Sequence, residues 1–155
     1  MIIYNLDTNS AEQTINIANL FVKNFLINNL NQDCNIIYLI GDLGAGKTTF
    51  IRGMLASFGF SGVVKSPTYT IVETYQDLKF PVYHFDLYRL NQANELELLG
   101  IRDYLHNQSI CCFEWPDKGL GHIPDPDFLI KFNILSGNSR QINISANKKL
   151  NGLPH

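Results

Sequence analysis

The residues with the clearest chemical pattern form one short stretch, Gly41-Asp42-Leu43-Gly44-Ala45-Gly46-Lys47-Thr48. Its spacing of glycine, four residues of any type, glycine, lysine and a hydroxyl residue is that of a phosphate-binding P-loop. Glycines permit loop conformations that side chains forbid, so successive backbone N–H groups can surround a phosphate. We expect Lys47 to reach the β- and γ-phosphates of a nucleotide and Thr48 to place its hydroxyl on Mg²⁺.

Two acidic residues follow short apolar runs later in the chain. Asp86 ends the run Val82-Tyr83-His84-Phe85, and Glu114 ends the run Ile110-Cys111-Cys112-Phe113. A P-loop requires a carboxylate at the end of a nearby strand to hold Mg²⁺ or its water shell. Both acids are candidates for direct metal binding on the residues alone. For His84, between aromatic residues, we expect a hydrogen-bonded core histidine rather than a catalytic one.

The loop needs a strand before it and a helix after it, and the flanking sequence predicts both. Residues 34–40 form a continuous apolar run rich in β-branched side chains, as in strands buried on both faces. Residues 47–58 predict a helix that Gly59 ends. Before them we expect a strand over 2–6 and an amphipathic helix over 10–30, opened by a capping box.

The second half of the chain has shorter apolar runs separated by turn residues. They predict a hairpin of 69–75 and 80–85, a short helix over 94–99, a strand over 110–113, a loop over 116–126 and a second hairpin of 128–135 and 141–145. Strands that alternate with helices indicate an α/β fold. We therefore expect a three-layer P-loop NTPase-like domain with a mixed β-sheet and two β-hairpins.

Length and composition set the wider limits. The chain has 155 residues, with 45% hydrophobic and 17% charged, which fits one globular domain and excludes wholesale disorder. We expect a single domain over 1–145 and a polar, frayed C-terminal tail over 146–155. The net charge of −2, with no basic run longer than Lys148-Lys149, disfavours a strong nucleic-acid-binding surface.

Cysteine spacing and the N-terminus indicate the cellular compartment. The three cysteines, Cys34, Cys111 and Cys112, have no CxxC spacing, which disfavours a disulfide framework and a structural zinc site. The N-terminus has no signal-peptide pattern, and no run of about 18 apolar residues is present to span a membrane. We expect a cytoplasmic protein with no membrane attachment.

Missing motifs narrow the class of nucleotide-binding protein. A GTPase would carry Asn-Lys-x-Asp, but the pair Asn147-Lys148 is followed by Lys149 and Leu150, with no acid in place. A small-molecule kinase usually has an arginine-rich lid, whereas the arginines here are widely spaced: Arg52, Arg89, Arg102 and Arg140. The sequence thus favours ATP with Mg²⁺ as the bound nucleotide and metal.

Several further blocks, taken with the loop, resemble one family. They are Lys65-Ser66-Pro67-Thr68-Tyr69-Thr70, Tyr83-His84-Phe85-Asp86-Leu87-Tyr88-Arg89, Glu97-Leu98-Leu99-Gly100-Ile101-Arg102-Asp103-Tyr104 and Phe113-Glu114-Trp115-Pro116. Over residues 4–145 the chain resembles the bacterial TsaE (YjeE) family. The resemblance implies a weak, partner-stimulated ATPase that assists synthesis of threonylcarbamoyladenosine, the modified tRNA adenosine beside the anticodon. It implies TsaB and TsaD homologues as partners, with tRNA contacted only through them.

The resemblance also implies roles for single residues. The nucleotide-binding residues would be Gly41, Asp42, Leu43, Gly44, Ala45, Gly46, Lys47, Thr48 and Thr49. Thr48 and Glu114 look like the Mg²⁺ site, and Asp86 looks like the acid that orients the attacking water. Lys47 completes the catalytic set with the two acids. Trp115 would pack near the nucleotide base, or is an ordinary core tryptophan at a strand end.

Three other residues keep two interpretations each. Thr68 either approaches the γ-phosphate or the metal-bound water, or belongs to a turn that starts a strand. Tyr88 and Arg89 are candidates for a partner contact, since tyrosine and arginine are favoured at interfaces. The alternatives for these two are a buried aromatic ring and a surface ion pair.

Two other functions would use the same loop. One is a P-loop kinase for a small hydroxylated or nucleoside substrate, with residues 116–126 covering its acceptor pocket. The other is a nucleotide-gated binding subunit, in which ATP stabilises an assembly-competent state without turnover.

Overall fold

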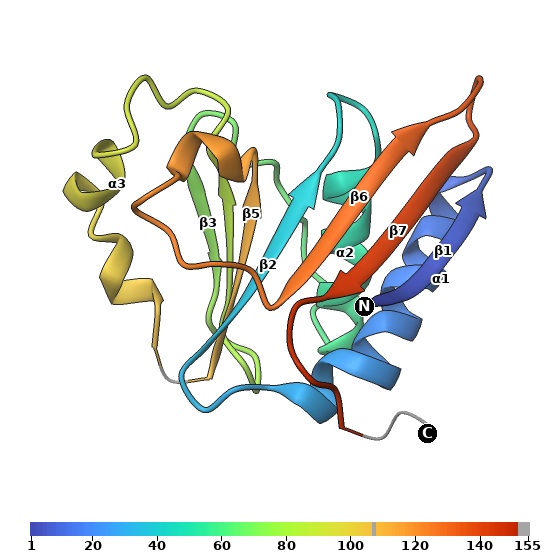
Figure 1. The fold of residues 1–155 in the computed structure, drawn as a ribbon, viewed down its shortest axis with the longest axis horizontal. Helices are drawn as coiled ribbons and strands as arrows, with labels where there is room; N and C mark the ends of the chain where they lie inside the picture. The colour runs from blue at the N-terminus through green and yellow to red at the C-terminus, as the bar shows by residue number, and fades with distance from the viewer. Residues whose placement is uncertain (107, 152–155) are drawn as a thin grey trace.

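The computed structural model describes residues 1–106 and 108–151 (Figure 1). Seven strands form one sheet in the order β1-β7-β6-β2-β5-β4-β3. The strands are β1 (Ile2–Thr8), β2 (Cys34–Ile40), β3 (Val72–Tyr75), β4 (Val82–Asp86), β5 (Ser109–Glu114), β6 (Phe128–Ile134) and β7 (Arg140–Ala146). The helices are α1 (Ala11–Phe21), α2 (Lys47–Ser57) and α3 (Glu95–Leu98), with short turns η1 (Val22–Leu26), η2 (Ile27–Asn29), η3 (Ile101–Tyr104) and η4 (Pro116–Gly119).

The centre of the sheet is parallel and its edges are antiparallel. β2 pairs in parallel with β5 and β6, and β4 pairs in parallel with β5. The β3–β4 and β6–β7 hairpins add antiparallel strands, and β1 pairs antiparallel with β7. The predicted mixed sheet and both hairpins are therefore confirmed.

Helices cover both faces of the sheet, so the predicted three layers are confirmed. On one face, α1 and α2 bury a core that includes Phe21, Phe50 and Phe128. On the other face, α3 and η3 cover a second core that includes Phe85 and Phe113 (Figure 1). No helix within the described residues is long and apolar enough to cross a membrane.

The close contact between α1 and α2 depends on a glycine. A Cβ atom at Gly53 would lie 2.8 Å from Ala18 Cβ and 2.9 Å from the backbone oxygen of Ile15. On the sheet side of α2, Phe50 packs edge-on against Phe132 of β6, with ring centroids 5.7 Å apart. These contacts fix α2 between α1 and the sheet.

Two elements depart most from their predicted bounds. The first long helix does not stay α-helical to residue 30, because α1 ends at Phe21 and continues through the π-helical η1 and the 3₁₀-helical η2. The Asn29 side chain donates to the Phe25 oxygen (2.7 Å) and so competes with backbone pairing. β3 begins at Val72 rather than Tyr69, because Ile71 has a left-handed backbone (φ 67°) that breaks the strand.

The C-terminal segment is hydrogen-bonded to the rest of the domain. The expectation of a tail frayed from residue 146 is therefore wrong over 146–151. Ala146 N donates to the Met1 oxygen (2.9 Å), and Lys148 Nζ donates to the Asn29 oxygen. Asn151 N donates to Asn29 Oδ1 at 2.6 Å. Hydrogen bonds to a distant helix end thus add to the core contacts of Ala146 and Leu150 in fixing the segment. Residues 152–155 lie outside the described residues, and the domain boundary at residue 145 stays a prediction.

Candidate functional site

The glycine-rich loop lies where its sequence predicts, between β2 and α2. Ala45 N donates to the Asp42 oxygen (3.1 Å), which closes a tight turn. Gly46 caps α2 with a left-handed backbone (φ 106°), and its oxygen accepts the Phe50 N–H (2.9 Å). That backbone conformation is disfavoured for residues with a Cβ. The positive end of the α2 dipole therefore faces the loop, as anion binding requires.

Lys47 lies inside the loop rather than in solvent. Its side chain donates to the oxygens of Gly41 and Asp42, the latter at 3.2 Å. The residue is 6% exposed, and its ammonium lies 4.9 Å from the centre of the Trp115 ring. Burial lowers the pKa of Lys47, while Glu114 and Asp86 act to raise it. The lysine is thus held beside both acids by the loop's own carbonyl groups.

The two acids meet at the carboxyl edge of the sheet. Glu114 of β5 is in register with Asp86 of β4 on one side and with Leu39 of β2 on the other. Asp86 is 6% exposed and Glu114 is 3% exposed. Burial raises the pKa of Asp86, and the neighbouring Glu114 raises it further. Asp86 Oδ1 accepts the Tyr88 N–H (3.0 Å), which fixes its carboxylate.

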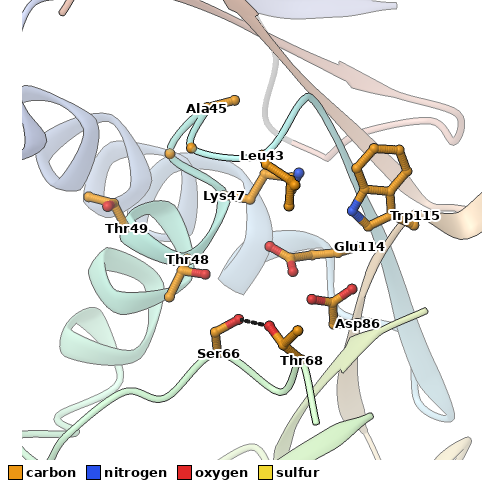
Figure 2. Close-up of a pocket in the computed structure, with 12 residues that line it drawn as sticks. Leu43, Ala45, Lys47, Thr48, Thr49, Ser66, Thr68, Asp86, Glu114 and Trp115 are labelled. Carbon is orange, nitrogen blue, oxygen red and sulfur yellow. Dashed lines mark hydrogen bonds between the residues drawn. The ribbon is translucent and has the colours of Figure 1, made fainter. Parts of the chain in front are cut away.

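A cavity of about 250 Å³ brings most of the predicted residues together. Its lining comprises Leu43, Gly44, Ala45, Gly46, Lys47, Thr48, Thr49, Ser66, Thr68, Asp86, Glu114 and Trp115 (Figure 2). Gly41 and Asp42 do not line it and instead hold Lys47 through their oxygens. Ser66 and Thr68, whose hydroxyls lie 2.9 Å apart, face the acids across the cavity (Figure 2).

Trp115 lies at the lysine end of this cavity. Its backbone is left-handed (φ 56°) and starts η4 directly after β5. Its ring lies 5.0 Å from that of Tyr88 and beside the Lys47 ammonium. The indole therefore borders the part of the site that Lys47 and the acids share.

His84 differs from its prediction. It is buried, with 0% exposure, but its ring nitrogens are not hydrogen-bonded: among the described residues they are the only buried side-chain nitrogen or oxygen atoms without a partner. Its Nε2 lies 3.6 Å from Glu114 Oε2. Sequence offered one signal, since His84 and Asp86 are two residues apart on a strand and so share a face.

A second cavity of about 380 Å³ borders the other side of the loop. Beside loop residues and Thr49, its lining includes Thr8, Asn9, Ser10, Ala11, Thr14, Asn138 and Arg140. Arg140 Nη2 also donates to the Gly44 oxygen at 3.4 Å. Sequence reasoning missed this set, because only the pairing of β1 with β7 brings the two ends of the chain to the loop.

The fold and the loop together define a P-loop NTPase-like protein: a parallel sheet centre with a glycine-rich loop joining a buried strand to a helix. The family model described as "Threonylcarbamoyl adenosine biosynthesis protein TsaE" matches residues 8–142. The chain belongs to the TsaE family.

Individual relatives agree with this assignment. The chain is 50% identical over 115 residues to a Haemophilus influenzae protein named tRNA threonylcarbamoyladenosine biosynthesis protein TsaE, covering 74% of this chain and 72% of that one. It is 34% identical over 138 residues to the Rickettsia prowazekii protein of the same name, covering 88% and 90%. The crystal structure of Bacillus subtilis YdiB superposes with a TM-score of 0.74 at 30% identity, covering 94% of this chain and 87% of that one.

Proposed function

We propose that this protein hydrolyses ATP with Mg²⁺ and thereby supports threonylcarbamoyladenosine synthesis on tRNA. One observation carries the enzymatic part: Lys47, Thr48, Asp86 and Glu114, from three separate segments, line a single cavity beside the P-loop. The names of its relatives support the pathway. Members of one family are expected to serve the same process.

The residues present fit a magnesium–nucleotide complex. Two buried carboxylates face one buried ammonium, so the site favours added positive charge. Mg²⁺ usually takes one or two protein oxygen ligands, with waters and substrate phosphates completing its shell. We assign the Thr48 hydroxyl and the Glu114 carboxylate to this role. When bound, the ion neutralises charge on the phosphates during phosphoryl transfer.

The remaining groups position the reactants. On nucleotide binding, the Lys47 ammonium would leave the oxygens of Gly41 and Asp42 and bind the terminal phosphates. The loop N–H groups and the N-terminus of α2 would bind the remaining phosphate oxygens. Asp86, fixed by the Tyr88 N–H, orients the attacking water. Hydrolysis of this kind depends on positioning and electrostatics, so Asp86 need not remove a proton before the phosphorus is attacked.

The two cavities also suggest how the nucleotide lies. The first contains the lysine and the acids, which belong with the β- and γ-phosphates. We therefore place the ribose and adenine in the second cavity, between the loop, the start of α1 and Arg140. In this arrangement Trp115 lies at the γ-phosphate end of the site. We therefore propose this position for Trp115 instead of the predicted one beside the base.

Partner proteins complete the proposal. We propose TsaB and TsaD homologues as the partners, with tRNA reached only through them, and a cytoplasmic location follows from that role. The net charge of −2 supports indirect tRNA contact. The Arg89 guanidinium stacks 4.3 Å above the 82%-exposed Tyr69 ring, next to the exposed Tyr88. This pair of aromatic residues with an arginine is the surface we assign to the partner contact.

The kinase alternative finds less support in the geometry. It needs an acceptor pocket under residues 116–126, yet no residue of that segment lines the P-loop cavity. Part of the segment packs instead on the opposite core, where a Cβ at Gly119 would lie 2.8 Å from Leu87. Water is therefore the favoured phosphoryl acceptor.

The test is phosphate release from ATP and Mg²⁺, with the protein alone and with a TsaB–TsaD pair. We expect a slow rate that rises with the pair and is lost in Lys47→Ala. Turnover that survives in Lys47→Ala would refute the assignment of the site. Transfer of γ-phosphate label to a metabolite would favour the kinase instead. Full multiple-turnover function with a non-hydrolysable ATP analogue would favour a nucleotide-gated subunit.

A further inference from the structure

His84 is a buried polar side chain that the proposed mechanism does not use. Its ring is fully buried on the face of β4 that carries Asp86, two residues further along the strand. Its register partner on β5 is Cys112, two residues before Glu114. The imidazole therefore lies directly behind the two carboxylates, on the core side of the site.

The contact between His84 and Glu114 is directional. Nε2 lies 3.6 Å from Oε2 of Glu114, so a shift of about 0.8 Å would give a charge-assisted hydrogen bond of about 2.8 Å. A carboxylate only accepts hydrogen bonds, so this arrangement selects the imidazole form with a proton on Nε2. Glu114 has a second oxygen, which remains for the cavity.

A buried imidazole without a hydrogen-bond partner is unfavourable. Side chains that only fill space in a protein core are rarely polar. Both ring nitrogens of His84 lack a hydrogen bond, whereas every other buried side-chain nitrogen or oxygen of the described residues has one. A purely structural residue at this place would be apolar, like its neighbours Val82 and Cys112. His84 is also unsuited to bind Mg²⁺ itself, because that ion prefers oxygen ligands.

We propose that His84 is a positioning residue for Glu114: its Nε2–H holds one carboxylate oxygen so that the other faces the metal. Ligating carboxylates are commonly fixed in this way by hydrogen bonds from behind. The inference rests on the proposed magnesium–nucleotide site. It adds to that proposal a residue that touches neither the nucleotide nor the ion.

The test compares three variants by metal binding rather than by turnover. His84→Phe removes the N–H at similar volume, His84→Gln keeps an N–H donor, and Val82→Ala is the control for a packing defect on the same face of β4. Mn²⁺ is titrated by electron paramagnetic resonance into protein saturated with ADP. ADP affinity is also measured in EDTA.

We expect His84→Phe to weaken Mn²⁺ binding about 10- to 100-fold, the usual effect of losing such a partner. ADP affinity in EDTA should stay unchanged, and His84→Gln and Val82→Ala should bind Mn²⁺ as the wild type does. Unchanged Mn²⁺ affinity in His84→Phe would overturn the inference. So would a parallel loss of ADP affinity in EDTA, or an equal loss in Val82→Ala.

A second measurement uses the wild-type protein and needs no metal. Long-range ¹H–¹⁵N correlation spectra report which imidazole nitrogen carries the proton, and the His84→Gln spectrum identifies the His84 signals. We expect Nε2 to be protonated, and a bare Nε2 would overturn the inference even if His84→Phe fails to fold. Wild-type protein that binds no Mn²⁺ with ADP would instead refute the proposed function.

Discussion

Replacing Asp86 with asparagine should stabilise the nucleotide-free protein at neutral pH and at the same time stop ATP turnover. Asp86 is buried beside Glu114, and burial together with that neighbour raises the pKa of Asp86. Asparagine has nearly the same shape and retains the oxygen that accepts the Tyr88 N–H. The substitution therefore removes a charge with little change in packing.

The sign of the pH dependence follows from that raised pKa. In the unfolded chain an aspartate titrates near its ordinary value of about 3.9. Because the folded pKa of Asp86 is higher, the protonated form stabilises the fold, and this contribution is lost as pH rises from the unfolded towards the folded pKa. The asparagine side chain does not ionise, so the Asp86→Asn variant gains stability over wild type above that interval. We expect about 1 kcal/mol, or about 3 °C in Tm for a chain of this length.

The assay is thermal unfolding of both proteins from pH 3 to pH 8, without nucleotide or divalent metal. The gain of Asp86→Asn should be absent at the acid end and complete at neutral pH, and Asp77→Asn, at an exposed position, should show none. ATP turnover should fall about 10²-fold or more, because the attacking water loses the carboxylate that orients it. A variant less stable at neutral pH, or equally stabilised at pH 3, would refute the electrostatic reasoning. ATP turnover at the wild-type rate in the Asp86→Asn variant would refute the role of Asp86.

Three further substitutions test the helix contact, the metal site and the second cavity. Gly53→Ala should destabilise the fold by about 1–3 kcal/mol in urea unfolding despite the better helix propensity of alanine, because its Cβ would meet Ala18 and Ile15; equal stability would contradict so close an approach. Thr48→Ala should raise the Mg²⁺ concentration for half-maximal turnover about tenfold or more while ADP binding in EDTA persists, and an unchanged Mg²⁺ dependence would exclude the hydroxyl as a ligand. Arg140→Ala should weaken ATP binding about tenfold, or about 1.4 kcal/mol, with kcat retained in steady-state kinetics; unaltered affinity would argue against adenosine in the second cavity.

Local features of the chain could be predicted well. The phosphate loop is set by its own glycines and by the elements that flank it, so β2 (Cys34–Ile40) and the start of α2 at Lys47 agree with expectation. The acids could be recognised because each ends a short apolar run, and parallel strands bring such ends to one edge. These predictions needed only residues close together in the sequence.

Other features of the fold and the site could not be predicted, because they depend on contacts between segments far apart in the sequence. The second cavity exists because β1 pairs with β7, with Thr8 opposite Arg140, and the sequence holds no signal for that register. The segment over 146–151 is ordered by Asn29, a polar residue whose partners are more than a hundred positions away. Composition predicted fraying there, because composition does not reveal such partners.

The register of β4 and β5 that places the two acids side by side is stabilised by a contact on the opposite face of the sheet. Phe85 and Phe113 are in register, and their rings stack 4.7 Å apart at 16° in the core under α3. A slip of one residue between β4 and β5 would turn one strand's side chains to the wrong face, separating Asp86 from Glu114 and breaking this stack. The aromatic pair therefore stabilises the register that brings Asp86 and Glu114 together. The same register places His84 behind Glu114, a relation between two strands that the sequence alone does not give.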